Sequence, residues 1–103
     1  MDDKDRLSRI ENYLKELCPG SVIEYAWKFE SRKYMFRVAA PSGETQHAIA
    51  ISEEFVSDNE PEDIVICLKL FNLKAYLDMY GSKEILVTND GINPEAIRPS
   101  LLK

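Results

Sequence analysis

The chain has 103 residues, of which 45% are hydrophobic, and its 18 acidic and 13 basic residues give a net charge of −5. This length and composition suffice for one domain with its own core and are too small for two domains. A net negative charge argues against non-specific binding to nucleic acid or anionic membranes, and no apolar run approaches the ~20 residues of a membrane span.

The first predicted element is an amphipathic helix over residues 5–18. Its apolar residues recur at helical spacing on one face. They are Leu7, Ile10, Leu14 and Leu17. Pro19-Gly20 ends the helix, because proline cannot continue it and glycine permits the turn.

Residues 22–30 and 33–39 are two predicted strands joined by a short turn. Alternation places aromatic side chains on one face of the first strand. These inward residues are Ile23, Tyr25, Trp27 and Phe29. The expected cross-strand pairs are Phe29 with Tyr34, Trp27 with Phe36 and Tyr25 with Val38. A third strand, 45–52, follows a turn at residues 41–43.

The stretch 61–81 is predicted to form the longest helix of the chain. Its start is marked by Pro61 and by three residues that favour the N-cap position, Ser57, Asp58 and Asn59. Gly81 suits the position that follows a helix end. At ~30 Å the helix would match a nine-residue strand in length, so it is expected to cover the aromatic face of the hairpin.

This predicted helix is apolar on two opposite sides, whereas a surface helix usually has one apolar stripe. The first stripe contains Ile64, Leu68, Phe71, Ala75 and Met79, and the second contains Ile66, Leu70, Leu73, Leu77 and Tyr80. Either one stripe meets the sheet and the other meets the first helix, or part of the second stripe binds another chain. The second stripe is therefore the candidate interface, and which stripe faces the sheet stays open.

Residues 83–88 form a short fourth strand, in which Ile85, Leu86 and Val87 indicate burial on both sides or at an interface. At most one helical turn is expected after Asn93-Pro94. The element order is α-β-β-β-α-β, and residues 1–103 form a single α+β domain. Its three-stranded antiparallel meander is covered by one long helix, and the fourth strand pairs either within the chain or across a dimer.

The order αβββα resembles that of the double-stranded-RNA-binding domain, and αβββαβ resembles the start of the type III secretion chaperones. Both resemblances rest on element order, without a family motif. The second implies a small, acidic and dimeric protein. The first implies a second helix that opens with basic residues, whereas this helix opens with Glu60, Glu62 and Asp63.

His47 is the only histidine and the candidate residue for a small ligand-binding or enzymatic domain, together with Thr45 and a carboxylate. A lone histidine on the inward side of a strand is more often a packed residue than a catalytic one. The chain has no GxSxG or CxxC motif and no clustered glycines. No catalytic residue, metal or cofactor is therefore predicted.

A local basic patch lies on the outer face and turn of the predicted hairpin, and it is the candidate contact for nucleic acid. Its members are Lys28, Arg32, Lys33 and Arg37. Glu24 and Glu30 are expected to neutralise it through exposed ion pairs, which are common and weak. Met35, beside several alanines, leaves a shallow patch that would suit a partner.

Cys18 and Cys67 lie on apolar sides of predicted helices and are expected to be reduced, buried thiols. The charged start of the chain lacks the apolar core of a signal peptide, so a cytoplasmic protein is expected. The sequence predicts a non-enzymatic protein–protein interaction module of the adaptor or chaperone-like kind, acting as a homodimer or with another protein.

Overall fold

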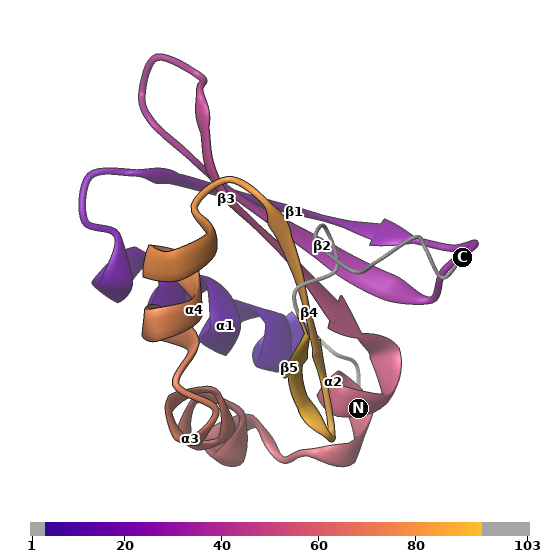
Figure 1. The fold of residues 1–103 in the computed structure, drawn as a ribbon. Coiled ribbons are helices and arrows are strands. Elements are labelled where there is room, and N and C mark those ends of the chain that lie inside the picture. Colours follow the sequence, from indigo (N-terminus) through magenta and orange to yellow (C-terminus); the bar gives the residue numbers. More distant parts are fainter. Residues whose placement is uncertain (1–3, 94–103) are drawn as a thin grey trace, which may run out of the picture.

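A computed structural model describes residues 4–93, and Figure 1 shows how its elements are arranged. The helices in this part of the chain are α1 (Lys4–Leu17), α2 (Glu53–Asp58), α3 (Pro61–Leu70) and α4 (Leu73–Tyr80). The strands are β1 (Val22–Lys28), β2 (Lys33–Ala39), β3 (Thr45–Ser52), β4 (Glu84–Thr88) and β5 (Gly91–Asn93). The helical turn expected after Asn93-Pro94 lies outside the described residues.

The strands form one sheet in the order β1-β2-β3-β4-β5. The first three strands are an antiparallel meander, β4 runs parallel to β3, and β5 returns antiparallel to β4. The predicted α+β class and meander are confirmed, and β4 pairs within the chain. β5 is a short strand that the sequence interpretation missed. β1 and β5 are the two edges of the described sheet.

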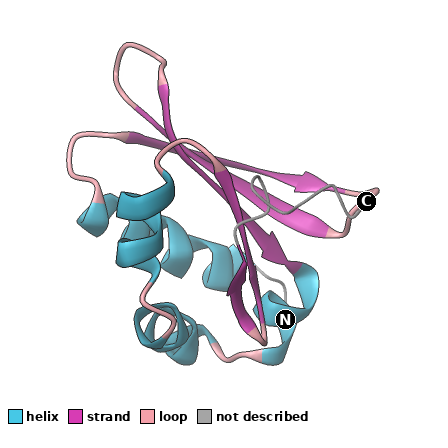
Figure 2. Ribbon diagram, viewed as in Figure 1, coloured by secondary structure: helices cyan, strands magenta, loops and turns pink. Residues whose placement is uncertain are grey.

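The described helices lie on one side of the sheet, as Figure 2 shows, and share a single core with it. α1 buries its predicted apolar face, with Leu7, Ile10 and Leu14 inside. The buried inward side chains of the sheet are Ile23, Phe36, Val38, Ile49, Ile51, Ile85 and Val87. None of the described helices has the length and apolar composition needed to cross a membrane.

The helix predicted over residues 61–81 is two helices, and the expectation of one continuous helix is wrong. Asn72 lies between them in the left-handed region, with φ 63° and ψ 47°. Its N–H donates to the Lys69 carbonyl at 2.9 Å, and its own carbonyl accepts from the Ala75 N–H at 3.1 Å. Asparagine therefore ends α3 and begins α4, because it tolerates this conformation better than most residues with a side chain.

The break accounts for the two apolar stripes, because each short helix buries a different one. α3 buries Ile64 and Leu68 of the first stripe, whereas α4 buries Leu73 and Leu77 of the second. α3 has 10 residues. It is therefore only ~15 Å long, half the length expected of the continuous helix.

The segment 53–59, which precedes the predicted long helix, contains α2. The Ser52 hydroxyl accepts from the Phe55 N–H at 3.1 Å and caps this helix, and Phe55 is fully buried. The predicted N-cap residues do not cap α3, which begins after Glu60 without a side-chain cap. Asn59 instead donates its side-chain amide to the Phe55 carbonyl at 2.7 Å.

β1 and β2 pair two residues away from the expected register. Trp27, and not Phe29, lies opposite Tyr34, and Tyr25 lies opposite Phe36. The shift arises because Phe29 belongs to the turn, which is longer than the two-residue turn that was expected. This shift places an aromatic residue at the very tip of the hairpin.

Candidate interaction surface

β1 is an edge strand, since it pairs with β2 on one side and with no described strand on the other. It has seven residues, and only Ile23 among them is buried. Figure 1 shows the β1–β2 hairpin reaching well beyond the helices. An edge strand presents a row of backbone N–H and carbonyl groups that another extended segment can pair with.

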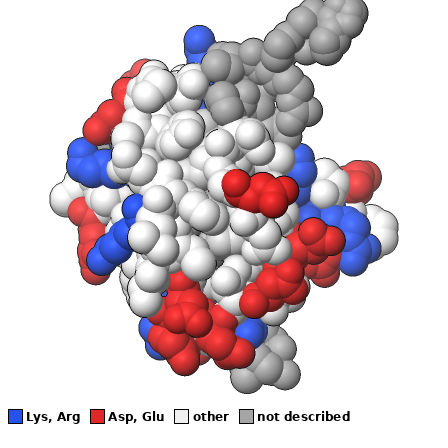
Figure 3. Space-filling model, turned by 60° about the horizontal axis from the view of Figure 1, so that its bottom comes forward, with Lys and Arg blue, Asp and Glu red and all other residues white. Residues whose placement is uncertain are grey.

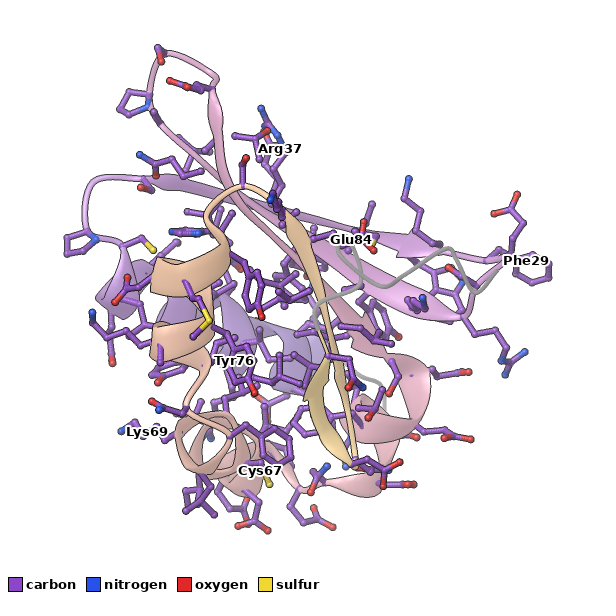
Figure 4. The ribbon with its side chains drawn as sticks, in the orientation of Figure 1. Phe29, Arg37, Cys67, Lys69, Tyr76 and Glu84 are labelled. Atoms are coloured by element: carbon purple, nitrogen blue, oxygen red, sulfur yellow. The ribbon has the colours of Figure 1, made fainter. Side chains whose placement is uncertain are left out.

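A row of aromatic side chains lies along this hairpin on the side that faces the helices. We define the aromatic row as Tyr25, Trp27, Phe29 and Tyr34. Tyr25, Trp27 and Phe29 are 39%, 40% and 75% exposed. Figure 4 shows Phe29 at the tip of the hairpin, away from the helices.

The rings of Tyr25, Trp27 and Tyr34 in the aromatic row are positioned against neighbouring rings of the sheet. The Trp27 ring centroid lies 4.8 Å from that of Tyr34, and the Tyr25 centroid lies 5.0 Å from that of the buried Phe36. Such tilted aromatic pairs are favourable beyond their buried area. The row is therefore a preformed apolar surface.

The expectation that a long helix covers this aromatic face is wrong, and the break at Asn72 is the reason. α1 contacts β1 and covers it where Ile23 is buried. With the predicted long helix divided into two short ones, no ~30 Å helix lies along the hairpin. The outer half of the aromatic face is left exposed.

The opposite face of the hairpin contains a shallow hollow of about 250 Å³, lined by Glu24, Tyr25, Ala26, Lys28, Met35 and Arg37. Arg37 borders it and is held by several contacts. Its Nη1 lies 3.2 Å from Glu24 Oε1, and its Nε donates to Thr45 Oγ1 at 2.7 Å. It also donates to the Gly43 carbonyl. The hollow therefore has a fixed charged rim beside the apolar Ala26 and Met35.

The structure divides the predicted basic patch. Arg37 is engaged as described, and Arg32 Nη2 lies 2.7 Å from Glu53 Oε1. Lys28 and Lys33 lie directly opposite each other at the end of the hairpin. On the face shown in Figure 3, basic side chains are scattered and acidic ones gather along the lower margin. Arg32 and Arg37 thus each face a carboxylate of the same chain.

His47 is half-buried on the inward side of β3, and its Nδ1 lies 3.1 Å from the Gly81 carbonyl oxygen. An imidazole N–H at this position donates to that carbonyl and links β3 to the end of α4. The Thr45 hydroxyl accepts from Arg37 instead. The two residues proposed for ligand binding therefore have separate partners.

The predicted interface residues on the two helices do not share one surface. Leu73 and Leu77 are 1% and 3% exposed and belong to the core, so they are unavailable to a partner in the folded chain. Tyr80 is half-buried, with its ring 6.1 Å from that of Tyr76. Only Ile66 and Leu70 remain exposed, at 54% and 78%.

Both cysteines are free and half-buried. Burial raises the pKa of the Cys18 thiol, and the nearby Asp78 raises it further while Lys74 lowers it. A raised pKa disfavours the nucleophilic thiolate. Cys67, labelled on α3 in Figure 4, has its Sγ 3.6 Å from Asn59 Oδ1. Among residues 4–93, no group of three or more His, Cys, Asp or Glu side chains is placed to hold a metal ion.

The sequence interpretation chose the helices for the interface and missed the β1 edge. The signal was present, because Tyr25, Trp27 and Phe29 form an aromatic alternation that begins the sheet. The sequence did not show that β1 lies at an edge of the described sheet, or that the helices within residues 4–93 leave its outer end uncovered. Comparison of the chain with protein-family models, with curated proteins and with solved structures finds no match.

Proposed function

We propose that the chain is a non-enzymatic protein–protein interaction module of the adaptor or chaperone-like kind, and that its binding surface is the β1 edge with the aromatic row. One observation supports this proposal most strongly. A seven-residue edge strand carries large aromatic side chains that none of the described helices covers.

Physical principles give this surface a binding role. Proteins usually protect an edge strand with charges, prolines, bulges or a covering segment. Here the edge holds Glu24 and Lys28 on one face, but its other face is aromatic. Tyrosine and tryptophan are enriched at interfaces and often dominate their binding energy. An extended segment added to β1 would gain backbone hydrogen bonds and aromatic contacts together.

The alternative functions have weaker support. A nucleic-acid contact needs several available cations, whereas Arg32 and Arg37 each face a carboxylate of the same chain. An active site at His47 needs polar groups that converge on a cavity, and the hollow described on the hairpin is not lined by His47. The cytoplasm is our proposed compartment, because both thiols are free.

A position-specific photo-cross-link tests the proposal. The photoreactive residue p-benzoylphenylalanine replaces Trp27 in the full chain, which is then expressed in its native host and irradiated. A matched control carries it at Leu70, which is more exposed than Trp27 and lies on another surface. We expect one partner species at position 27, joined through a single contiguous stretch of its sequence.

The expected adduct is absent when the probe is at position 70 and when the chain is unfolded in urea before irradiation. Adducts at both positions in equal yield, or none at position 27, would show that the β1 edge is not the binding surface. The mass of the adduct also reports whether the partner is a second copy or a different protein.

A further inference from the structure

We propose that the partner at the β1 edge is a second copy of this chain, paired antiparallel strand to strand about a two-fold axis at Ala26. This inference rests on the proposed function and adds the identity of the partner and the register of the pairing. The two five-stranded sheets would then join into one continuous sheet, with the helices of both copies on the same side.

The charges on β1 select this register. When Ala26 lies opposite the partner's Ala26, a residue that follows Ala26 by a given number of positions faces the partner residue that precedes Ala26 by the same number. Glu24 then lies opposite the partner's Lys28, and the symmetry creates this pair twice. Opposite charges directly across from each other stabilise a sheet, and like charges destabilise it.

The aromatic face is complementary in the same register. Tyr25 lies opposite the partner's Trp27, again twice. Aromatic cross-strand pairs are among the most favourable in sheets. Tyr25 and Trp27 are 39% and 40% exposed in the single chain, so both can bury apolar area against a neighbour.

Other registers that keep the helices on one side lack this match. Centring the pair on Tyr25 removes the charge pair and places Lys28 opposite Val22 of the partner. Centring it on Trp27 leaves only residues 26–28 of each β1 paired, without a charge pair. Centring it on Glu24 places that carboxylate opposite itself, and like charges directly opposite each other are unfavourable.

The charge pattern within one chain is consistent with this pairing. Lys28 lies directly opposite Lys33 across the hairpin, an unfavourable like-charge pair. The partner's Glu24 would lie on the other side of Lys28 and offset this repulsion. Glu24 itself faces Arg37 within the chain at 3.2 Å. In the dimer, each Glu24 would therefore lie between two cations, Arg37 of its own chain and Lys28 of the partner.

Disulfide trapping tests the register directly. In a background with Cys18 and Cys67 both changed to alanine, Ala26→Cys places two cysteine Cα atoms ~4.5–5.5 Å apart across the axis. This separation is within the range that a disulfide spans. Val22→Cys is the matched control, because the register separates position 22 from its symmetry mate by eight residues, ~27 Å. With oxidised glutathione, we expect a disulfide-linked dimer from Ala26→Cys and not from Val22→Cys.

A charge exchange provides the second measurement, by sedimentation equilibrium. Lys28→Glu relieves the like-charge pair with Lys33 within the chain but places a glutamate opposite the partner's Glu24, at both symmetry-related positions. We expect it to weaken dimerisation ~5- to 30-fold, while the circular dichroism spectrum stays that of the folded chain. Glu24→Lys alone should also weaken it. An equimolar mixture of the two variants should form heterodimers, because every opposing pair is again of opposite charge.

The outcomes separate this inference from the proposed function. A dimer that gives equal disulfide trapping at positions 22 and 26, or a mixture that does not form heterodimers, would overturn the register. A chain that is monomeric at millimolar concentration would overturn the second copy as partner. In that case an adduct with a different protein at position 27 would leave the proposed function standing, and the absence of any adduct would remove both.

Discussion

The break between α3 and α4 predicts unequal roles for two leucines that a continuous helix would make equivalent. Leu70 and Leu77 are seven residues apart, two helical turns, and would share one stripe of an unbroken helix. In the structure Leu77 is 3% exposed and belongs to the core, whereas Leu70 is 78% exposed. The same substitution, leucine to alanine, should therefore have very different effects on stability.

Leu77→Ala removes buried methyl and methylene groups and leaves a cavity, so we expect a loss of ~2–4 kcal/mol in the free energy of unfolding. Leu70→Ala removes side-chain atoms that are mostly in water, so we expect a change within ~0.5 kcal/mol. In a domain of this size, the larger loss corresponds to a melting temperature lower by roughly 10–25 °C.

Urea unfolding monitored by circular dichroism measures both losses. Lys28→Glu serves as the background, because dimerisation would otherwise add a concentration-dependent contribution to stability. Equal losses for the two variants, whether both large or both small, would refute the broken helix and the burial that follows from it. A large loss for Leu70→Ala alone would mean that α3 turns Leu70 toward the core and that α4 exposes Leu77.

Three further predictions concern the backbone, the histidine and the thiol. Asn72→Ala should cost ~1–2 kcal/mol, because alanine resists the left-handed conformation, whereas Asn72→Gly should not; urea unfolding of both variants measures this. His47→Leu should lower stability by ~0.5–1.5 kcal/mol, since the Gly81 carbonyl loses its donor, and should leave dimerisation unchanged in sedimentation. Burial raises the pKa of both Tyr13 and Cys18. The folded chain thus keeps protons that the unfolded chain releases, and stability measured across pH should fall as the pH rises past 9.0, the ordinary value for the thiol.

Much of the fold could be predicted from periodicity. Alternation identified β1, β2 and β3, and helical spacing identified α1, because a side chain's direction follows directly from backbone geometry. The run Ile85, Leu86 and Val87 identified β4. The break at Asn72 was hidden, since asparagine is an ordinary helix residue unless its neighbours require the left-handed conformation. The two opposite apolar stripes of residues 61–81 were the one feature of the sequence that indicated a break in the helix.

The candidate site was harder to predict than the fold. Ile66 and Leu70 were identified as interface residues and are exposed, but Leu73 and Leu77 of the same stripe are in the core. The aromatic residues of β1 were assigned to the core, because an apolar row on a strand usually faces a covering layer. Whether that layer reaches the end of the hairpin depends on helix length, and helix length depended on Asn72.

The central claim is that the open edge of β1 binds another chain through its backbone and its aromatic row. Hydrogen–deuterium exchange of the purified chain, measured across a range of protein concentrations, tests this claim most directly. The account predicts that amides of β1 become more protected as the concentration rises, while amides of α3, next to Ile66 and Leu70, do not change. Protection that rises in α3 and stays constant in β1 would contradict it.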